Sequence, residues 1–431
     1  MIGPLLERAM RRAEAADAAL KSDETLTLVF EAGRLKSTAF SQERGLNLRV
    51  SAEGRLGFAG TTSDDVDALL EAALASARVG DAVDLLLPAP APLPSVTTWY
   101  PRAAAATLEN LRDLGRELVD RLTRDGCQVA VTVERSIGSV AVANTRGVAA
   151  SYDVSVLTIA AEVTRVAGDD VLMVADYWAS ADFPDDTVTG ALAQSILKRL
   201  DWAAQPAGPP HGALPVLFTP QGAHAILLPL RQACHGKAVL QGISPLAGRQ
   251  GEQMFDSALT IADDPFLEAA PGSRPIDDEA VPTRRLSLVQ QGVVGEFIYD
   301  LETACRAGVP ATGHARRSTF GKPQAAYSNL AIAAGADGWD DLLQRIPDGL
   351  LVDELIGVGQ GNVIGGAFSH PVALAYRVIS GEVVGRVKDA AVAGNAYELL
   401  GRLGGLGRDV ERRGSLLLPP ILLEGVAVAP R

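Results

Sequence analysis

Residues 349–352 read Gly349-Leu350-Leu351-Val352, and short apolar runs bounded by glycine recur through the second half of the chain. Gly381-Glu382-Val383 and Val392-Ala393-Gly394-Asn395 follow the same pattern. Brief Val and Leu runs separated by Gly are typical of a curved, mostly antiparallel β domain, which we expect at residues 213–431. Three helical exceptions are predicted in this unit: Gln221–Gln232, Gly338–Arg345 and Ala396–Leu403.

Residues 1–100 predict a first α+β unit. Apolar residues along one side indicate a helix at Pro4–Ala19, followed by a strand at Thr25–Phe30. Alternating residues on either side of a glycine turn predict a hairpin at Leu46–Ala59. Ser63-Asp64-Asp65 is typical of an N-cap, so a helix should run from there to about Arg78. The proline-rich stretch 86–101 is expected to be a connector.

Residues 101–205 predict a second α+β subdomain. It should begin with a helix at Ala105–Arg124 and contain a later helix at Asp185–Leu200. Alternating, Val-rich segments between them predict an antiparallel sheet. The strands are expected at Gln128–Glu134, Ser139–Ala143 and Ser155–Thr164. Pro and Gly make 203–212 the clearest linker. The predicted class is α+β: an N-terminal α/β region with antiparallel sheets and flanking helices, then the curved β domain.

Composition excludes several classes of protein. The net charge of −13 disfavours nucleic-acid binding, which needs clustered Lys and Arg. No run of eighteen or more apolar residues is present, so we expect no membrane span and a cytoplasmic location. The chain has 3 widely spaced cysteines, Cys127, Cys234 and Cys305, which predict reduced, buried thiols rather than a disulfide or zinc-finger framework.

Several glycine-rich blocks carry a family resemblance. They are Gly349–Val352, Gly359-Gln360-Gly361, Gly366-Ala367-Phe368-Ser369, Gly381–Val383 and Val392–Asn395. Together they resemble the TldD/PmbA (TldE) family. The resemblance implies that TldD-like members hold a metal with a helical His-Glu-x-x-x-His motif and a cysteine near the C-terminus. In this chain the three motif positions fall on Arg231, Gln232 and Gly236, and the tail 413–426 has no cysteine.

Those substitutions remove the chemistry of a metal site. A catalytic zinc needs imidazole, thiolate or carboxylate ligands and a nearby base. Arg231 is a permanent cation, Gln232 accepts no proton, and Gly236 has no side chain. His235 is one position out of register, and on a helix that step rotates its imidazole about 100° away from the metal face. We therefore predict a degenerate site, with no catalytic residue and no metal ligand in this chain.

Arg231 and His235 are retained as candidate contacts for a peptide or a partner, since a guanidinium binds carboxylates well. A Cys234–His235 nucleophile pair is disfavoured because adjacent helical residues point apart. The segment Thr312–Arg317 resembles the family's Thr-Gly-Asn-x-Arg-Arg, with His314 in place of Asn. In the family this segment is a mobile loop near the cleft between subunits. His314, Arg316 and Arg317 are therefore further candidates for peptide or partner binding, against the alternative of a solvated basic turn.

Other motifs predict no chemistry. Gly357–Gly366 lacks the Gly-Lys-Ser/Thr ending and the βαβ context of a phosphate-binding loop. Its glycines are expected to let the backbone pass close to other backbone, or to present an edge to an extended peptide. The carboxylate groups Asp277-Asp278-Glu279 and Asp353-Glu354 are predicted to mark solvated faces.

The resemblance implies a TldE/PmbA-like subunit that is inactive alone. It would pair with a TldD-like metallopeptidase subunit, which holds the zinc, in a heterodimer enclosing a chamber. Such pairs degrade unfolded peptides or remove leader peptides. Two alternatives stay open: a self-sufficient or repurposed enzyme of a biosynthetic pathway, and a homodimeric protein that binds peptides without cutting them.

Overall fold

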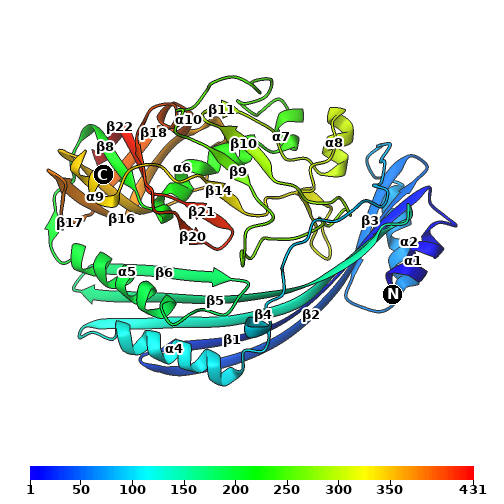
Figure 1. Cartoon of the computed structure of the whole chain (residues 1–431), viewed down its shortest axis with the longest axis horizontal. Coiled ribbons are helices and arrows are strands. Elements are labelled where there is room, and N and C mark those ends of the chain that lie inside the picture. The colour runs from blue at the N-terminus through cyan, green and yellow to red at the C-terminus, as the bar shows by residue number, and fades with distance from the viewer.

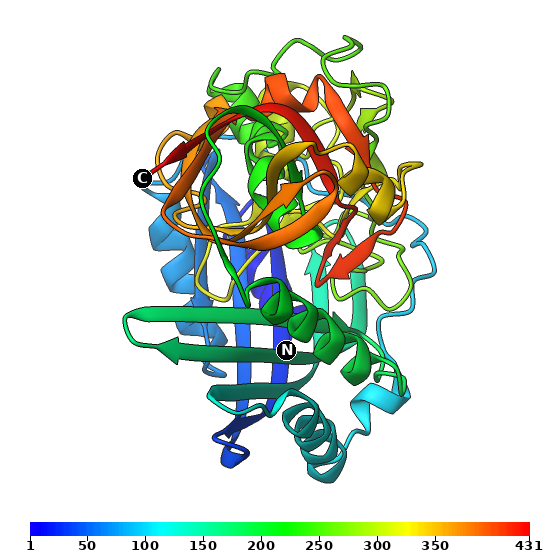
Figure 2. The same ribbon diagram turned by 90° about the vertical axis from the view of Figure 1, so that its left-hand side faces the viewer.

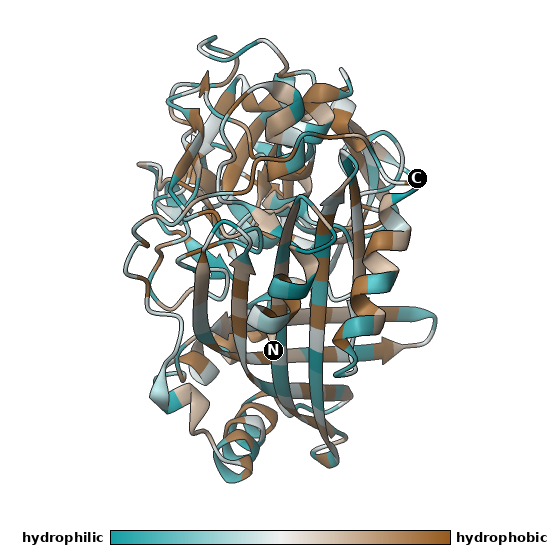
Figure 3. Ribbon diagram, turned by 90° about the vertical axis from the view of Figure 1, so that its right-hand side faces the viewer, coloured by the Kyte–Doolittle hydropathy of each residue, from teal (hydrophilic) through white to brown (hydrophobic).

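The computed structural model describes residues 1–431. Its N-terminal half is built on one antiparallel six-stranded sheet in the order β3-β2-β1-β4-β5-β6, a long curved layer in Figure 1. Apolar and polar residues alternate along several of these strands, as the brown and teal bands of Figure 3 show. The strands are β1 (Ala15–Glu31), β2 (Arg34–Ala52), β3 (Arg55–Thr61), β4 (Cys127–Asn144), β5 (Ala149–Ala167) and β6 (Asp170–Ser180).

Helices cover one face of this sheet at its two ends. Ala16 and Ala18 of β1 are buried with α1 and α2, while Leu28 and Phe30 of the same face are buried with α4. Between these pairs the face carries polar residues such as Ser22. The middle of the face is therefore not covered by a helix. The helices of this half are α1 (Ile2–Ala9), α2 (Val66–Ala77), α3 (Pro101–Ala104), α4 (Leu108–Leu122) and α5 (Val188–Trp202).

The C-terminal half contains an eight-stranded sheet, a six-stranded sheet and a two-stranded ribbon. The first sheet holds β7 (Pro206–Ala207), β8 (Gly212–Phe218), β15 (Asp348–Leu355), β16 (Ala367–Ile379), β17 (Glu382–Val387), β18 (Ala390–Asn395), β19 (Leu403–Leu406) and β22 (Ile421–Pro430). The second holds β9 (Ile261–Asp263), β10 (Leu286–Gln290), β11 (Val293–Val294), β14 (Leu330–Ile332), β20 (Glu411–Arg413) and β21 (Leu416–Leu418). The ribbon is β12 (Ala315–Arg316) and β13 (Gln324–Ala325).

Helix α6 (Pro220–Ala233) shares the largest hydrophobic core with residues of both of these sheets. The opposite face of the eight-stranded sheet packs with α5 through Leu217, Leu351 and Tyr376. Figure 2 shows the C-terminal half, green to red, above the N-terminal sheet. None of the helices combines the length and apolar character needed to span a bilayer. The other helices are α7 (Gly236–Leu240), α8 (Leu301–Ala307), the 3₁₀ turn η1 (Val363–Gly365), α9 (Trp339–Gln344) and α10 (Ala396–Leu400).

A buried ion-pair network joins the N-terminal sheet to the C-terminal half. Arg49 of β2 donates from Nε to Asp17 of β1 over 2.8 Å and also pairs with Glu279. Arg317 pairs with the same Asp17. Lys21 of β1 reaches Asp278 over 2.6 Å. Charges buried in this way stabilise a fold only when each has its partner.

This network corrects the prediction that Asp277-Asp278-Glu279 marks a solvated face. Each of the three side chains belongs to a residue that is only 1% exposed. Asp277 accepts hydrogen bonds from the backbone N–H groups of Glu279, Val281 and Ala315. The cations that balance Asp278 and Glu279 come from β1 and β2, more than 200 residues earlier, so a reading of neighbours in sequence does not find them.

Asp353 is a second correction. It was predicted on a solvated face with Glu354, but it is 2% exposed and accepts from Arg199 over 2.8 Å and from Thr219 over 2.8 Å. Arg199 also pairs with Asp176, which takes a further ion pair from Arg413. Glu354 remains exposed, as predicted. The network ties α5 and β6 to β15 and β20.

The α+β class is confirmed, and so are several of its elements. The hairpin at Leu46–Ala59 is the β2–β3 pair, and Asp65 caps α2 by accepting from the N–H of Ala68 over 2.9 Å. The helix predicted at Pro4–Ala19 is wrong in its second half, because α1 ends at Ala9 and Ala15 begins β1. Burial of Ala16 and Ala18 between β2, β4 and the helices overrides the helix propensity of alanine.

The sheet is continuous across the boundary predicted at residues 100 and 101. β1 pairs with β4 from Asp17 opposite Asn144 to Glu31 opposite Ala130, so units 1–100 and 101–205 share one sheet. The stretch predicted as a connector, 86–101, has no regular structure until α3 begins at Pro101. The predicted linker 203–212 contains β7, which pairs with β17.

Candidate functional site

The degenerate motif lies at the end of α6, not along a continuous helix. Thr219 caps α6 by accepting from the N–H of Gly222, and the helix ends at Ala233. His235 is extended, forms a bridge to Ile298, and precedes α7, which begins at Gly236. The predicted rotation of His235 on a helix is therefore wrong, because the chain leaves α6 two residues earlier.

Arg231 is held by aromatic and imidazole groups. Its Nη1 donates over 3.1 Å to Nε2 of His224, which lies two turns earlier on the same helix. Its guanidinium carbon lies 5.6 Å from the centre of the Tyr327 ring, within range of a cation–π interaction. Burial, and then the charge of Arg231, lower the pKa of His224. The Nε of Arg231 is buried and has no partner.

Tyr327 links the two candidate binding residues, Arg231 and His235. Its hydroxyl donates to the carbonyl oxygen of Arg231 over 2.7 Å, and so satisfies a carbonyl at the C-terminal end of α6. Its ring meets the His235 ring edge to face, with the centres 5.3 Å apart. One tyrosine therefore occupies the space between these two side chains.

The ring of Tyr299 packs against Gly236, the third motif position. A Cβ built on Gly236 would lie 2.1 Å from Cδ1 of Tyr299, so this ring stands where a side chain would begin. No group of three or more His, Cys, Asp or Glu side chains is placed to hold a metal ion. Guanidinium, amide and phenol groups do not fit the donor set of a zinc site, so the motif residues of this chain do not fit the metal that the family implies.

A pocket of about 750 Å³ opens beside His235. It is lined by charged side chains of both signs from four segments: Asp81, Lys237, Asp300, Glu302, Arg306 and Lys322. Lys322 bridges Asp81 over 3.1 Å and Glu302 over 2.6 Å. Lys237 is exposed and has no ion-pair partner. The pocket therefore offers one unpaired cation to a ligand carboxylate.

His235 faces this pocket as a neutral imidazole. Burial, followed by the charge of Arg231, lowers the pKa of His235 to about 4. Its ring nitrogens have no hydrogen-bond partner within the chain. A neutral imidazole has one donor and one acceptor, so His235 could bind the backbone of a peptide.

The cysteines do not supply a nucleophile to this site. Cys234 is fully buried, and burial alone raises the pKa of its thiol to about 12. Cys305 is exposed and donates to the carbonyl oxygen of Asp84 over 3.1 Å, while Cys127 is partly buried. The prediction of a buried thiol is therefore wrong for Cys305, which lies on the exposed side of the short helix α8.

The segment 312–317 is not a solvated loop. His314 is 1% exposed, with Nε2 3.0 Å from Oδ2 of Asp263 and Nδ1 2.9 Å from the carbonyl oxygen of Thr312. Arg317 is 4% exposed and belongs to the network that joins the two halves of the molecule. Arg316 alone keeps partial exposure. The structure thus leaves His314 and Arg317 no surface from which to touch a peptide.

The glycine-rich segment 357–366 packs against α6 rather than forming a phosphate cradle. Gly359 lies beside Leu228, and a Cβ on Gly366 would meet the ring of Tyr397 at 2.3 Å. The hydroxyl of Tyr397 donates to the carbonyl oxygens of Ile364 and Pro229, which ties this segment to α6. The atoms that crowd Gly366 belong to side chains, so neither predicted role, backbone passing close to backbone or an edge for an extended peptide, is shown at this glycine.

Tyr299, Tyr327 and Lys237 are site residues that sequence reasoning missed. Both tyrosines follow the motif by more than 60 residues and belong to no motif of their own. Their only signal in the sequence is scarcity, since the chain has 7 tyrosines. Lys237 directly follows the degenerate motif and could have been included with it.

Comparison with known proteins places this geometry in a family. Sequence models of the PmbA/TldA metallopeptidase match residues 16–77 (domain 1) and 211–430 (C-terminal domain). A protein of Methanothermobacter thermautotrophicus named "Metalloprotease" is 26% identical over 429 residues, covering 95% of this chain and 91% of that protein. "Metalloprotease PmbA" of Escherichia coli O157:H7 is 29% identical over 216 residues, 49% of this chain and 46% of that protein.

"Metalloprotease TldD homolog" of Haemophilus influenzae is 30% identical over 161 residues, 37% of this chain and 33% of that protein. Among solved structures, TldE from Thermococcus kodakarensis superposes with a TM-score of 0.89 at 23% identity, covering 99% of each chain. A "putative modulator of a DNA gyrase" from Thermotoga maritima gives a TM-score of 0.88 at 21% identity and covers 100% of each chain. The fold is that of these proteins. Since the C-terminal model alone matches more than half of the sequence, the chain belongs to the PmbA/TldD metallopeptidase family.

Proposed function

We propose that this chain is the non-catalytic, TldE/PmbA-type subunit of a TldD/TldE-type zinc metallopeptidase, whose TldD-like partner carries the metal and cleaves unfolded or leader peptides. One observation carries the proposal: Arg231, Tyr327 and Tyr299 fill the region in which metal ligands would stand. The names of the relatives support it, because both TldD-type and PmbA-type proteins match this chain.

The two edges of the N-terminal sheet support docking of a second chain. The β6 edge is blocked: Arg386 donates to the carbonyl oxygen of Val171, Arg199 to that of Ala175, and the N–H of Ala181 is taken by Ala269. The β2 edge is open. β3 covers β2 only from Leu46 to Ala52, which leaves residues 37–45 paired with β1 alone. An open edge accepts an extended strand through its free backbone groups.

Small side chains on the concave face of the sheet support passage of a peptide. A hollow of about 480 Å³ between this face and α6 is lined mainly by alanine and threonine, together with Gln221 of α6. Its sheet residues include Ala130, Thr132, Thr158 and Ala160. Short side chains leave room for a chain of varied sequence, so we assign this surface to the wall of the peptide chamber.

The test is reconstitution with the TldD-like subunit of the same genome. Fluorescein-labelled casein is incubated with the partner, with this chain, and with the mixture, each with and without 1,10-phenanthroline. We expect cleavage only in the mixture and its loss on chelation. Full activity of the partner alone, or cleavage by this chain alone, would contradict the proposal. The burial of Cys234 removes the most reactive group that a repurposed enzyme could use here.

A further inference from the structure

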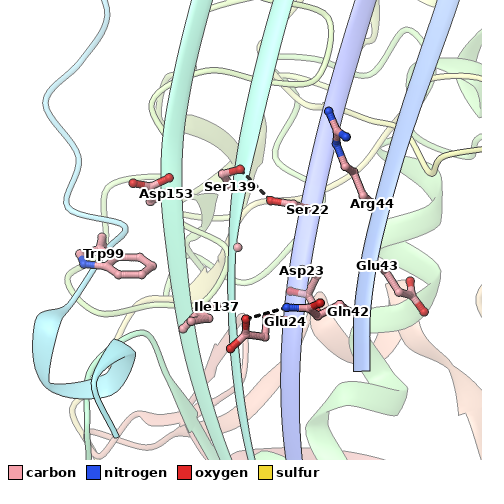
Figure 4. Close-up of a pocket in the computed structure, with 11 residues that line it drawn as sticks. Ser22, Asp23, Glu24, Gln42, Glu43, Arg44, Trp99, Ile137, Ser139 and Asp153 are labelled. Atoms are coloured by element: carbon pink, nitrogen blue, oxygen red, sulfur yellow. Dashed lines mark hydrogen bonds between the residues drawn. The ribbon is translucent and has the colours of Figure 1, made fainter. Parts of the chain in front are cut away.

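The uncovered middle of the helix-bearing sheet face contains a groove of about 490 Å³. Figure 4 shows it crossing β5, β4, β1 and β2, with Trp99 and Asp153 at one end and Arg44 at the other. Small side chains form its floor. Ser22 and Ser139 lie opposite each other there, with their hydroxyl oxygens 2.8 Å apart. Larger residues surround this floor, so the groove is a feature of the strand sequence and not only a gap between helices.

Trp99 is held in place although its ring is partly exposed. Thr98 donates from Oγ1 to the carbonyl oxygen of Asp153 over 2.6 Å, and its own carbonyl oxygen accepts from the N–H of Ser155. The N–H of Tyr100 donates to Oγ of Ser155 over 3.0 Å. These bonds fix the backbone on both sides of Trp99 to β5. Yet Trp99 is 38% exposed and belongs to no hydrophobic cluster, so its indole face is available to a ligand.

The charges around the groove leave one carboxylate free beside that ring. Glu24 is paired with Arg135 and accepts from Gln42, and Arg44 is paired with Asp64. Asp153 is exposed, and its carboxylate takes part in no hydrogen bond or ion pair. A free carboxylate next to an indole face is suited to a cation, which can pair with one and stack on the other.

We propose that this groove binds an extended polypeptide segment through an arginine or lysine side chain, which stacks on Trp99 and pairs with Asp153. A polypeptide is favoured over a small cation because the groove continues across four strands to Arg44 and offers serine and amide groups along its length. The net charge of −13 attracts basic segments over a distance. The site lies on the face opposite the concave hollow, so it is separate from the proposed peptide chamber.

Binding is measured on this chain alone, which separates the result from the cleavage test above. The probe is the peptide acetyl-Gly-Ser-Arg-Ser-Gly-amide, and its binding is measured by calorimetry and by tryptophan fluorescence. The neutral control is the same peptide with citrulline in place of arginine. We expect the arginine peptide to bind more tightly than the citrulline peptide, and Trp99→Ala to weaken it about 3- to 30-fold. Asp153→Asn should weaken it as well, and 0.5 M NaCl should reduce the difference between the peptides.

Control variants place an equivalent change outside the groove. Phe320→Ala removes another exposed aromatic ring and Glu382→Gln another exposed acid, and neither should alter binding. Trp99→Phe keeps a ring and should give an intermediate affinity. Each variant must keep the wild-type melting temperature, which is expected for positions this exposed.

Four results would overturn the proposal. Equal affinity for the arginine and citrulline peptides, or an unchanged affinity in Asp153→Asn, would mean that the groove does not recognise a cation. Binding of maltohexaose that is lost in Trp99→Ala but is insensitive to Asp153→Asn and to salt would identify a sugar site instead. Conversion of a dimer to a monomer by Trp99→Ala, with no peptide binding, would make this face a contact between copies of the chain.

Discussion

Gly236 determines what the motif region can hold. Restoring one motif ligand with Gly236→His is expected to destabilise the protein without creating a metal site, because the new side chain meets the Tyr299 ring at its first atom. Even Gly236→Ala should cost about 1–3 kcal/mol of unfolding free energy through overpacking. Thermal unfolding measures this, with Gly208→Ala as the control, since a Cβ there meets nothing within 4 Å. An unchanged melting temperature in Gly236→Ala would contradict the packing that we describe.

His235 gives the site a pH dependence with a defined sign. Its pKa in the folded protein is about 4, against about 6.5 in an unfolded chain. Between these values the unfolded state binds more protons, so stability falls as the pH decreases from about 6.5 to 4. Urea unfolding at pH 7.5 and at pH 5.0 measures the change. The unfolding free energy should fall less between these two pH values in His235→Gln than in the wild type. A titration of the His235 ring by NMR near pH 6.5 would show that this prediction is wrong.

At the scale of elements, the open part of β2 should tolerate proline at alternate positions only. Successive N–H groups of a strand point to opposite sides. One of the two variants Phe40→Pro and Ser41→Pro therefore removes a hydrogen bond to β1, and the other removes an N–H group that points away from the sheet. We expect one variant to melt much earlier than the other. The better tolerated variant should then fail to copurify with the TldD-like partner. Normal copurification by that variant would exclude this edge as the docking site.

Element prediction from sequence succeeded where local signals decide the structure. The hairpin at Leu46–Ala59 and the cap at Asp65 depend on neighbours within a few residues, and both are present. The failures depend on distant residues. Ala15–Ala19 favours a helix by composition, but strands on both sides of it make it part of β1. The helix predicted at Gln221–Gln232 ends within one residue of α6, but the extended conformation of His235 was missed, because its bridge to Ile298 spans more than 60 residues.

At the scale of the molecule, breaking a buried ion pair between its halves should destabilise the protein more than breaking an exposed pair. Arg49→Met leaves Asp17 and Glu279 without a shared partner in a buried site, which should cost about 3–5 kcal/mol. Arg112→Met removes an exposed arginine that pairs with Glu109 and should cost about 0–1 kcal/mol. Urea unfolding of the two variants measures the difference. Equal effects would mean that the network does not hold the halves together.

For the candidate site, the sequence allowed only the positions of the altered motif to be assigned. Arg231, Gln232 and Gly236 could be placed because the motif is local and the family blocks fix its position. What fills the site could not be predicted, because Tyr299 and Tyr327 reach it through tertiary packing. His314 and Arg317 were expected to contact a peptide, but their acidic partners Asp263 and Asp17 lie 51 and 300 residues away.

The unequal edges of the N-terminal sheet limit how far that sheet can be extended by strands from other molecules. Once a strand from another molecule lies along β2, the far border of this chain's sheet offers no further place to add, since arginine side chains already cap it. Two such molecules joined along β2 would present only the blocked β6 edges of their N-terminal sheets. Extension of this sheet by strand addition would therefore stop at a pair.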